Sequence, residues 1–562
     1  GNIYYTGENM AFDIKISPCA FYNYSKSFGE YDAVLKYTLL GENKNEVSKI
    51  GTKTVSVKPC QTVSDTVAFD VQKYGIYYLK IEIICDKYNV FGEKETEFSY
   101  VNSDKTTVNY DFGITGGQKI ANTEKLAKNA GIGSMRWVRN MRDVMSLTYN
   151  DTSYTLKEKG ISTEWKNWQN TLESNGFDII NTLLAQSMPY SNQTKNGYKL
   201  HIPYGADGRD LFAQYCRYFA QNVSSQYYEI WNEFDSPAGK SYNMNGEDYR
   251  NYGNLLVKSA DTVYSCDPDA EIIAVVSGSK STHEKAIKRV IELIGAGKAE
   301  NMLDKYFNIA SAHPYHWNDN PLFAEYTDTG EMTDMYKHMK EIRDLYDSYN
   351  LKNTRLYVTE VAWSPHYTAY NEYGAFPDNK NIIADPSKAI RKPITEKQQG
   401  SYLVQTYVMM KKDNLVEKFI PYLFVRQTNV RVDRDKNMGI LKNYKSYLED
   451  VPLAATNAYL AVSNMNMLLA NAQYVSDFYF DDTSKTAVCY RYSKNSGNDI
   501  AVLWSAKEDG ENVSVNFGCK KITVYDEYGN ASEMQSDSGI YSFNLTQSTV
   551  YATGNFSEFK KN

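Results

Sequence analysis

Between residues 106 and 471, short runs rich in aromatic and β-branched residues alternate eight times with amphipathic stretches of helical period. The strand-like runs lie near residues 109–114, 133–138, 177–184, 226–232, 271–277, 307–312, 355–360 and 417–424. The helical stretches include residues 163–175, 210–222, 246–265, 285–294, 334–349 and 395–412, with a last one near 453–471. Eight such repeats in about 365 residues predict a (β/α)₈ TIM barrel with enlarged loops.

The segments on either side of the barrel instead follow the two-residue period of half-buried strands, as in 10–16 and 500–504. Turn residues separate these runs, and no helical period intervenes. We therefore predict three domains: an N-terminal β-sandwich at 1–105, the barrel at 106–471 and a C-terminal β-sandwich at 472–562. We expect the two sandwiches to pack together against one side of the barrel.

Composition argues against several kinds of partner and cofactor. A net charge of −7 disfavours nucleic acid and anionic membranes as partners, and the chain has no run of about 18 apolar residues that could span a bilayer. The seven cysteines are scattered without a C-x-x-C pair, so the sequence indicates neither a zinc site nor a disulfide framework. We predict no metal and no cofactor, and the oligomeric state is left open. The chain starts at Gly1 without a signal peptide, which says little about export, and we expect a secreted or cell-surface protein.

Two of the predicted strands end on a glutamate. Glu233 closes the aromatic run of the fourth strand, and Glu360 closes that of the seventh. Either residue alone could equally belong to the start of the next helix or to a surface ion pair. However, desolvating a carboxylate is costly unless the group is paired or used. Because parallel strands end at one mouth of a barrel, the two carboxyls can face one another, as cleavage of a glycosidic bond requires.

Polar and aromatic residues near these strand ends are candidates for substrate binding: Asn232, Arg136, His313, Tyr315, Trp317 and Trp363. An amide beside the acid can hold a sugar hydroxyl, and a tryptophan can cover the apolar face of a sugar ring. Each candidate has a structural alternative. Arg136 could form an ion pair inside the barrel, with Arg139 as a rival for its role, and His313 could be a hydrogen-bonded structural histidine. The two tryptophans could simply pack the loops, although the long loop after Glu360 is typical of a lid or binding wall.

These residues resemble those of the clan A glycoside hydrolases. The match lies in 231–233 and 359–360, on the strands where that clan carries its acid/base and its nucleophile. Residues 131–137 resemble the clan's second strand, which ends in an arginine, and 313–315 resemble its sixth-strand motif. Residues 438–441 and the segment after them are similar to members with an accessory β-domain, such as family thirty-nine.

The resemblance implies a retaining glycoside hydrolase that cleaves a poly- or oligosaccharide, with Glu233 as acid/base and Glu360 as nucleophile. Such a mechanism needs carboxyls about 5–5.5 Å apart, one ionised and one protonated. We expect Arg136 to contact Glu360 and keep it ionised, Tyr315 to donate to Glu360, and Asn232 to hold the hydroxyl beside the anomeric carbon.

Three alternatives stay open to different degrees. A transglycosylase shares the same first step and cannot be separated by sequence. A non-catalytic carbohydrate-binding protein on a barrel scaffold is disfavoured by the intact pair of glutamates. A phosphate-handling lyase or aldolase would need a strand-end lysine or a Gly-rich phosphate loop, and the run 419–425 is followed by Arg426 and Gln427 instead. The sequence identifies neither the sugar nor exo or endo action.

Overall fold

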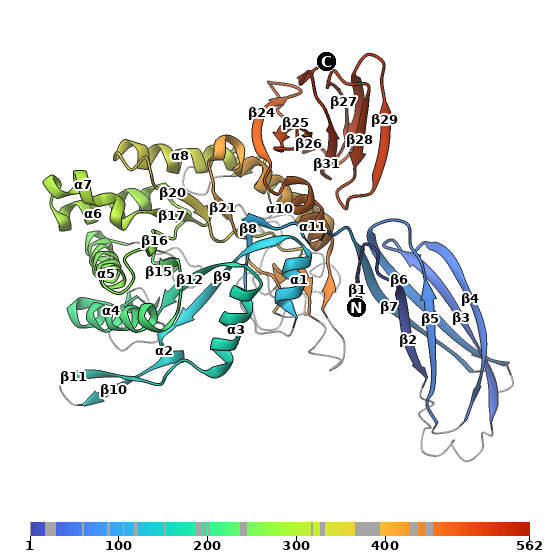
Figure 1. Ribbon diagram of the computed structural model, residues 1–562, viewed down its shortest axis with the longest axis horizontal. Helices are drawn as coiled ribbons and strands as arrows, with labels where there is room; N and C mark the ends of the chain where they lie inside the picture. Colours follow the sequence, from blue (N-terminus) through green and yellow to red (C-terminus); the bar gives the residue numbers. More distant parts are fainter. Residues whose placement is uncertain are drawn as a thin grey trace.

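The computed structural model describes residues 2–16, 30–58, 61–86, 90–104, 106–116, 122–150, 153–185, 194–195, 198–199, 202–235, 244–315, 319–325, 332–365, 394–427, 437–443 and 453–562. Figure 1 shows the barrel with its helices at the left and two β-domains at the right, one formed by each end of the chain. The predicted architecture of a TIM barrel with additional β-domains is confirmed.

Eight parallel strands close the barrel in the order β8-β9-β12-β15-β16-β17-β20-β21. Their bounds are β8 (Asn109–Thr115), β9 (Ile132–Asn140), β12 (Asp178–Leu184), β15 (Tyr227–Ile230), β16 (Glu271–Ala274), β17 (Ile309–Ala312), β20 (Arg355–Val358) and β21 (Lys418–Phe419). A layer of large apolar side chains fills the interior: Ile180, Tyr227, Ile273, Ile309, Tyr357 and Ile420. Side chains therefore pack the interior of the barrel, which is not an open pore.

The helices of the barrel domain are α1 (Thr123–Asn129), α2 (Met141–Val144), α3 (Thr163–Ser174), α4 (Gly205–Asn222), α5 (Gly246–Tyr264), α6 (Lys280–Ile294), α7 (Ala296–Tyr306), α8 (Met335–Ser348), α10 (Glu396–Met410) and α11 (Asn457–Leu469), with a 3₁₀ turn at Lys412–Asn414. Sequence explains several starts: Asn245 and Asp248 form a capping box at α5, and Thr395 and Gln398 form one at α10. Helices α10 and α11 are buried almost all round because the flanking domains cover their outer faces.

Short two-stranded sheets lie in the loops of the barrel domain. They are β10 (Met145–Asn150) with β11 (Ser153–Glu158), β13 (Thr194–Lys195) with β14 (Tyr198–Lys199), β18 (Ala324–Glu325) with β19 (Met332–Thr333), and β22 (Leu441–Lys442) with β23 (Ala454–Ala455). The β10–β11 hairpin, which our reading of the sequence did not predict, follows the second barrel strand and lies at the edge of the molecule in Figure 1.

The N-terminal domain is a sandwich of two sheets. Its strands are β1 (Asn2–Tyr5), β2 (Met10–Ile16), β3 (Tyr31–Gly41), β4 (Glu46–Val57), β5 (Val63–Phe69), β6 (Gly75–Cys85) and β7 (Val90–Val101). The order β1-β7-β6-β3-β4 forms the larger sheet, and β2 pairs with β5 in the smaller. Alternate residues of β3, such as Ala33, Leu35 and Tyr37, face the core, as the two-residue period predicts.

The C-terminal domain is a second sandwich, with sheets β24-β25-β26-β31-β28-β29 and β30-β27-β32. Its strands are β24 (Gln473–Tyr479), β25 (Ala487–Ser493), β26 (Asp499–Ser505), β27 (Glu511–Asn516), β28 (Lys521–Tyr525), β29 (Ala531–Gln535), β30 (Ile540–Leu545), β31 (Val550–Gly554) and β32 (Lys560–Lys561). The core between the sheets includes Val515, Phe517 and Leu545.

Helix α11 joins the three domains. Its Asn464 accepts a hydrogen bond from Asn102 of the N-terminal domain at 3.2 Å and donates to the carbonyl of Glu527 of the C-terminal domain at 3.3 Å. The two sandwiches also contact each other: Tyr74 N–H donates to Asn530 Oδ1 at 2.8 Å, and Asn530 Nδ2 donates back to the Tyr74 carbonyl at 3.1 Å. They therefore pack together on the α11 side of the barrel, as expected.

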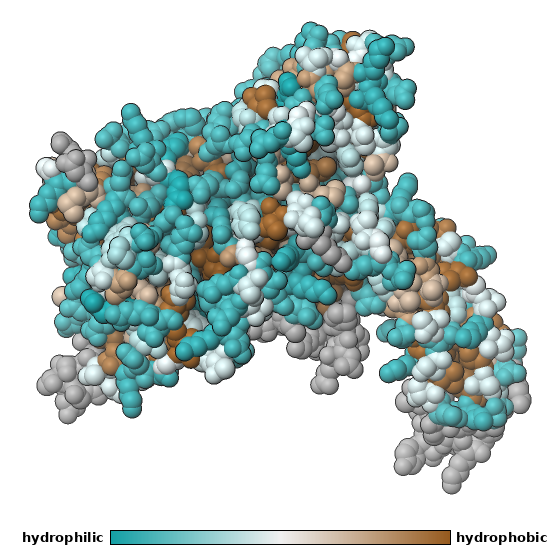
Figure 2. Space-filling view, viewed as in Figure 1, coloured by the Kyte–Doolittle hydropathy of each residue, from teal (hydrophilic) through white to brown (hydrophobic). Residues whose placement is uncertain are grey.

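Most of the face seen in Figure 2 is hydrophilic, with small apolar areas scattered over the barrel and the sandwiches. Among the described helices, none is both long and apolar enough to cross a bilayer.

Candidate active site

The chain turns sharply where the fourth barrel strand, β15, ends. Trp231 and Glu233 both have positive φ, 72° and 41°, which is uncommon for residues other than glycine and costs free energy. Packing holds this turn: the Trp231 ring contacts Phe212 of α4, and Phe234 stacks on Tyr252 of α5 at 3.6 Å between centroids. The indole and phenyl groups point into the core, which leaves the Glu233 carboxyl at the barrel mouth.

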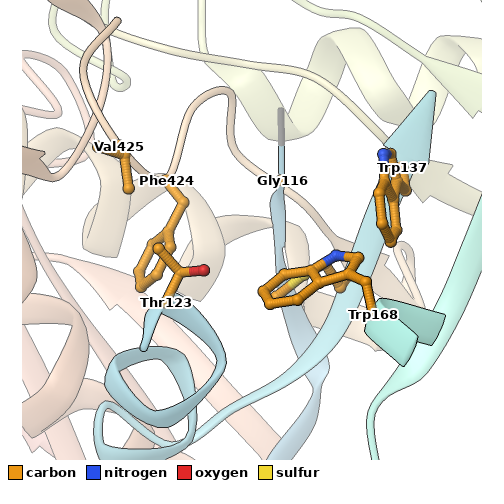
Figure 3. A pocket seen from close by; sticks show the side chains of 7 residues that line it. Gly116, Thr123, Trp137, Trp168, Phe424 and Val425 are labelled. Atoms are coloured by element: carbon orange, nitrogen blue, oxygen red, sulfur yellow. The ribbon is translucent and has the colours of Figure 1, made fainter. Parts of the chain in front are cut away.

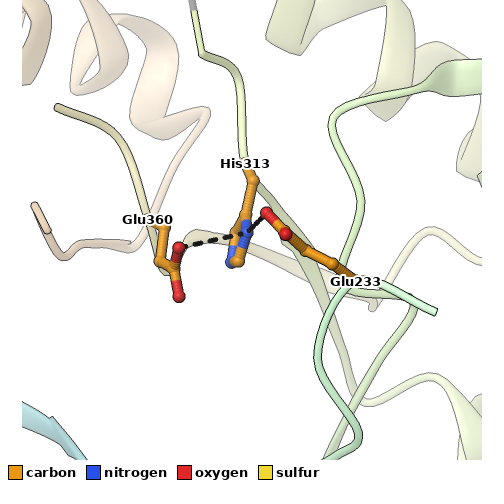
Figure 4. Close-up of side chains that lie close together, drawn as sticks. All are labelled: Glu233, His313 and Glu360. Carbon is orange, nitrogen blue, oxygen red and sulfur yellow. Dashed lines mark hydrogen bonds and ion pairs between the residues drawn. The ribbon is translucent and has the colours of Figure 1, made fainter. Parts of the chain in front are cut away.

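Glu233 and Glu360 lie on either side of His313 (Figure 4). One carboxylate oxygen of each glutamate and one ring nitrogen of His313 all lie within 4.8 Å of one another. The side chains of Glu233 and Glu360 are 22% and 13% exposed, so both are reachable from solvent. Two carboxyls this close do not readily ionise together, which favours one proton shared unequally between them.

Glu360 is held by a cation and a phenol. Arg136 Nη1 donates to Glu360 Oε1 at 2.5 Å, and Tyr315 Oη donates to Oε2 at 3.1 Å. Both contacts were predicted from the sequence and are confirmed. Burial by itself raises the pKa of Glu360, but the charges of His313 and Arg136, with the two hydrogen bonds, outweigh burial and hold its pKa below the usual value. Glu360 is therefore the carboxyl that stays ionised.

Arg136 is itself held by a carboxylate whose role was not predicted from the sequence. Glu229, in the middle of β15, accepts from Arg136 Nε at 2.9 and 3.2 Å and from Thr182 Oγ1 at 2.9 Å, and the side chains of Arg136 and Glu229 are both 0% exposed. Arg136 Nη2 donates to Asn232 Oδ1 at 2.7 Å. A glutamate inside an otherwise apolar strand requires a buried cation, and that signal was available in the sequence.

Glu233 has the opposite environment. Burial raises the pKa of Glu233, and the charges of Glu360 and Asp235 raise it further, although a hydrogen bond with His313 acts in the other direction. His313 Nδ1 lies 2.8 Å from Glu233 Oε1, and Nε2 lies 3.0 Å from Thr359 Oγ1. Burial lowers the pKa of His313, but the Glu360 and Glu233 carboxylates outweigh burial and raise it. The imidazole thus links the two carboxyls.

The other predicted residues have mixed outcomes. Asn232 lies at the site, but its Oδ1 accepts from Arg136, so only its amide N–H groups are left for a sugar hydroxyl. Trp363 was expected to bind substrate, and the structure corrects this. It is 1% exposed, its ring packs against Tyr402, and its Nε1 donates to the Asp319 carbonyl at 3.1 Å. It packs the loops and has no free face for a sugar. Trp317 lies outside the described residues.

Arg139, the rival to Arg136, lies outside the catalytic cluster. Its guanidinium covers the rings of Trp137 and Trp165, with its central carbon 3.6 and 4.1 Å from their centroids, and it donates to Asn181 and Gln169. Burial lowers the pKa of Arg139 to about 9. Arg136 and Arg139 face opposite sides of β9 because side chains alternate along a strand.

Among the residues that the structure describes, Glu233, His313 and Glu360 form a group that could offer three ligand atoms to a metal ion. Their surroundings fit such an ion poorly. The Arg136 guanidinium already neutralises Glu360, and a second cation there would meet like charge. His313 has partners at both ring nitrogens, so neither is free to ligate without breaking a contact.

A small cavity of about 20 Å³ lies beside the barrel rather than at this cluster (Figure 3). The residues around it are Gly116, Thr123, Met135, Trp137, Trp168, Phe424 and Val425. A cavity of this size has room for about one water molecule and is too small for a sugar ring.

Comparison with known proteins gives a likeness of structure without a likeness of sequence. No known family profile and no curated protein sequence matches the chain. The structure is similar to that of a family 39 glycoside hydrolase from the gut symbiont Bacteroides cellulosilyticus WH2, with a TM-score of 0.67 and 16% identity over 94% of this chain and 95% of that one. It is also similar to a glucosidase from Croceicoccus marinus, with a TM-score of 0.50 and 11% identity over 80% of this chain and 96% of that one. At these identities the likeness establishes a shared fold.

Proposed function

We propose that this protein is a retaining glycoside hydrolase, with Glu360 as nucleophile and Glu233 as acid/base, acting on a poly- or oligosaccharide. The observation that carries the proposal is the asymmetry of the pair. Glu360 is bound by Arg136 and Tyr315 and has a lowered pKa, whereas burial raises the pKa of Glu233. Two carboxyls whose environments push their pKa values apart are suited to act as nucleophile and acid.

In the first step, the ionised Glu360 carboxylate attacks the anomeric carbon while the glycosidic C–O bond breaks. Glu233 gives its proton to the departing oxygen, so the leaving group departs as a neutral alcohol. The sugar is then bound to Glu360 as an ester. Arg136 and Tyr315 orient the attacking carboxylate, and the Asn232 amide is placed beside it to donate to a sugar hydroxyl.

In the second step, Glu233 acts as base. The ester at Glu360 carries no negative charge, and the Glu360 charge is one of the causes that raise the pKa of Glu233, so this pKa falls. Glu233 then takes a proton from water as the water attacks the anomeric carbon. The bond to Glu360 breaks, the carboxylate is restored, and the product keeps the configuration of the substrate.

Carboxylate oxygens within 4.8 Å of one another place both carboxyls within reach of a single glycosidic bond, as a glycosidase with two carboxyls requires. The fold shared with a family 39 glycoside hydrolase supports the proposal independently. A transglycosylase would use the same first step and differ in its acceptor. We also propose that the protein is secreted or held at the cell surface.

The test is a panel of nitrophenyl glycosides, followed by proton NMR of the first anomer released from the substrate that is cleaved. We expect retention of configuration. Release of the inverted anomer would contradict the double-displacement mechanism, and an inert protein across mono- and oligosaccharide glycosides would favour a carbohydrate-binding role. For variants of Glu233 and Glu360, the matched control is Glu533→Ala, at an exposed position of the C-terminal domain, which should behave as wild type.

A further inference from the structure

A second acid on the loop after β15 lies near the catalytic pair and has no role in the chemistry above. Asp235 follows Glu233 by two residues, and Phe234 between them points into the core. Asp235 Oδ2 accepts hydrogen bonds from Ser277 Oγ at 2.6 Å and from Thr282 Oγ1 at 2.7 Å. These hydroxyls belong to the loop after β16 and to the first turn of α6. They hold the carboxylate in one orientation.

Asp235 is only partly withdrawn from solvent. Burial raises the pKa of Asp235, yet the side chain stays partly exposed. Both hydroxyl bonds end on Oδ2, and Oδ1 takes no part in either. An ionised carboxylate has about four acceptor sites, so a partly exposed carboxylate fixed by two hydroxyls can still accept a hydrogen bond from a ligand.

The position of Asp235 decides which part of a substrate it would contact. Of the groups that hold Glu360, Arg136 lies on the second barrel strand and Tyr315 follows the sixth. Asp235 is instead tied between the loops after strands four and five, beside Glu233. Since Glu233 must touch the glycosidic oxygen to protonate it, the group that leaves lies on the Asp235 side.

We propose that Asp235 accepts a hydrogen bond from a hydroxyl of the departing sugar, so that the substrate is an oligo- or polysaccharide rather than a glycoside of a simple alkyl or aryl alcohol. This inference rests on the proposed glycosidase function. Ser277 and Thr282 are positioning residues that hold Oδ2 and orient the carboxylate. A hydrogen bond to a charged acceptor contributes about ten- to hundredfold in affinity, which sets the expected effect.

The test compares Asp235→Ala and Thr282→Val with wild type on two substrates that share one sugar at the cleaved bond: its nitrophenyl glycoside and the corresponding disaccharide. Only the disaccharide has a leaving group with hydroxyls. We expect the ratio of kcat/KM on the disaccharide to that on the aryl glycoside to fall about ten- to hundredfold for Asp235→Ala, and less for Thr282→Val. Asp207→Ala, at an exposed position on α4, is the matched control and should keep the wild-type ratio.

A second measurement follows the covalent intermediate. With the aryl glycoside as donor and a free monosaccharide as competing acceptor, Asp235→Ala should shift the product from transfer toward hydrolysis, because acceptor and leaving group share one position. An unchanged kcat/KM ratio, or a lower ratio with no shift from transfer toward hydrolysis, would overturn the inference. If wild type cleaves neither substrate class, the proposed function fails first and this inference fails with it.

Discussion

Arg136 donates to both carboxylate oxygens of Glu229, and neither side chain is exposed to solvent. The same guanidinium reaches Glu360 through Nη1. One buried cation thus joins the middle of the fourth strand to the end of the seventh. The position of the nucleophile therefore depends on a carboxylate that never touches substrate.

This relationship predicts a large loss of stability for Glu229→Gln. The substitution takes away one of the two carboxylates that pair with the buried Arg136, and breaking a buried ion pair from one side costs about 3–5 kcal/mol. Urea denaturation followed by circular dichroism measures the change. Glu247→Gln is the control, because its pair with Arg250 is exposed and contributes at most about 1 kcal/mol. A Glu229→Gln protein that unfolds at the wild-type urea concentration would show that the pair does not stabilise the barrel.

Loss of the nucleophile should nearly abolish turnover. Glu360→Ala is expected to lower kcat by roughly 10⁴-fold or more, because the covalent intermediate can no longer form. Azide, which fits the space left by the carboxylate, should restore part of the activity and give a glycosyl azide of inverted configuration. Product analysis by NMR identifies this species. Normal activity in the variant would remove Glu360 from the mechanism.

Loss of the acid should depend on the leaving group. Glu233→Ala is expected to reduce kcat/KM far more for disaccharides than for nitrophenyl glycosides, since only a poor leaving group needs protonation. The basic limb of the pH profile should also flatten for activated substrates. Initial rates on a series of aryl glycosides with graded leaving-group pKa values measure the effect. Equal losses across the series would give Glu233 another role.

His313 should set the position of the pH optimum. Activity requires ionised Glu360, whose lowered pKa defines the acidic limb, and protonated Glu233, whose raised pKa defines the basic limb. His313 lowers the pKa of both carboxyls, so His313→Gln should raise both and move both limbs to higher pH. The profile of kcat/KM against pH reports this shift.

The control for that experiment is His338→Gln. The His338 ring bonds the Gly278 carbonyl at 3.0 Å, and the charge of His338 is not among the causes that shift the pKa of either glutamate. Its pH profile should match that of wild type. Movement of only one limb in His313→Gln would mean that His313 acts on a single carboxyl.

Much of the architecture could be predicted from local patterns. The change from a two-residue period to alternating strands and helices placed the barrel between two β-domains, since periodicity reports which face of each element is buried. The strand count also predicted that Glu233 and Glu360 lie at the same mouth of the barrel, because all its parallel strands end there. The contacts of Arg136 and Tyr315 with Glu360 were expected from the resemblance of the motifs and not from the strand count.

Tertiary structure alone decided which side chains reach the cleft and which partners they have. Trp363 was expected to bind substrate, yet the packing of Tyr402 against its ring buries it. The hydroxyls that hold Asp235 come from residues about 40 positions away, Ser277 and Thr282, whose approach depends on how two loops meet. The exposure and the partners of a side chain depend on many neighbours that are distant in sequence. A local pattern therefore determines which strand carries a side chain. Only the packed fold determines what that side chain contacts.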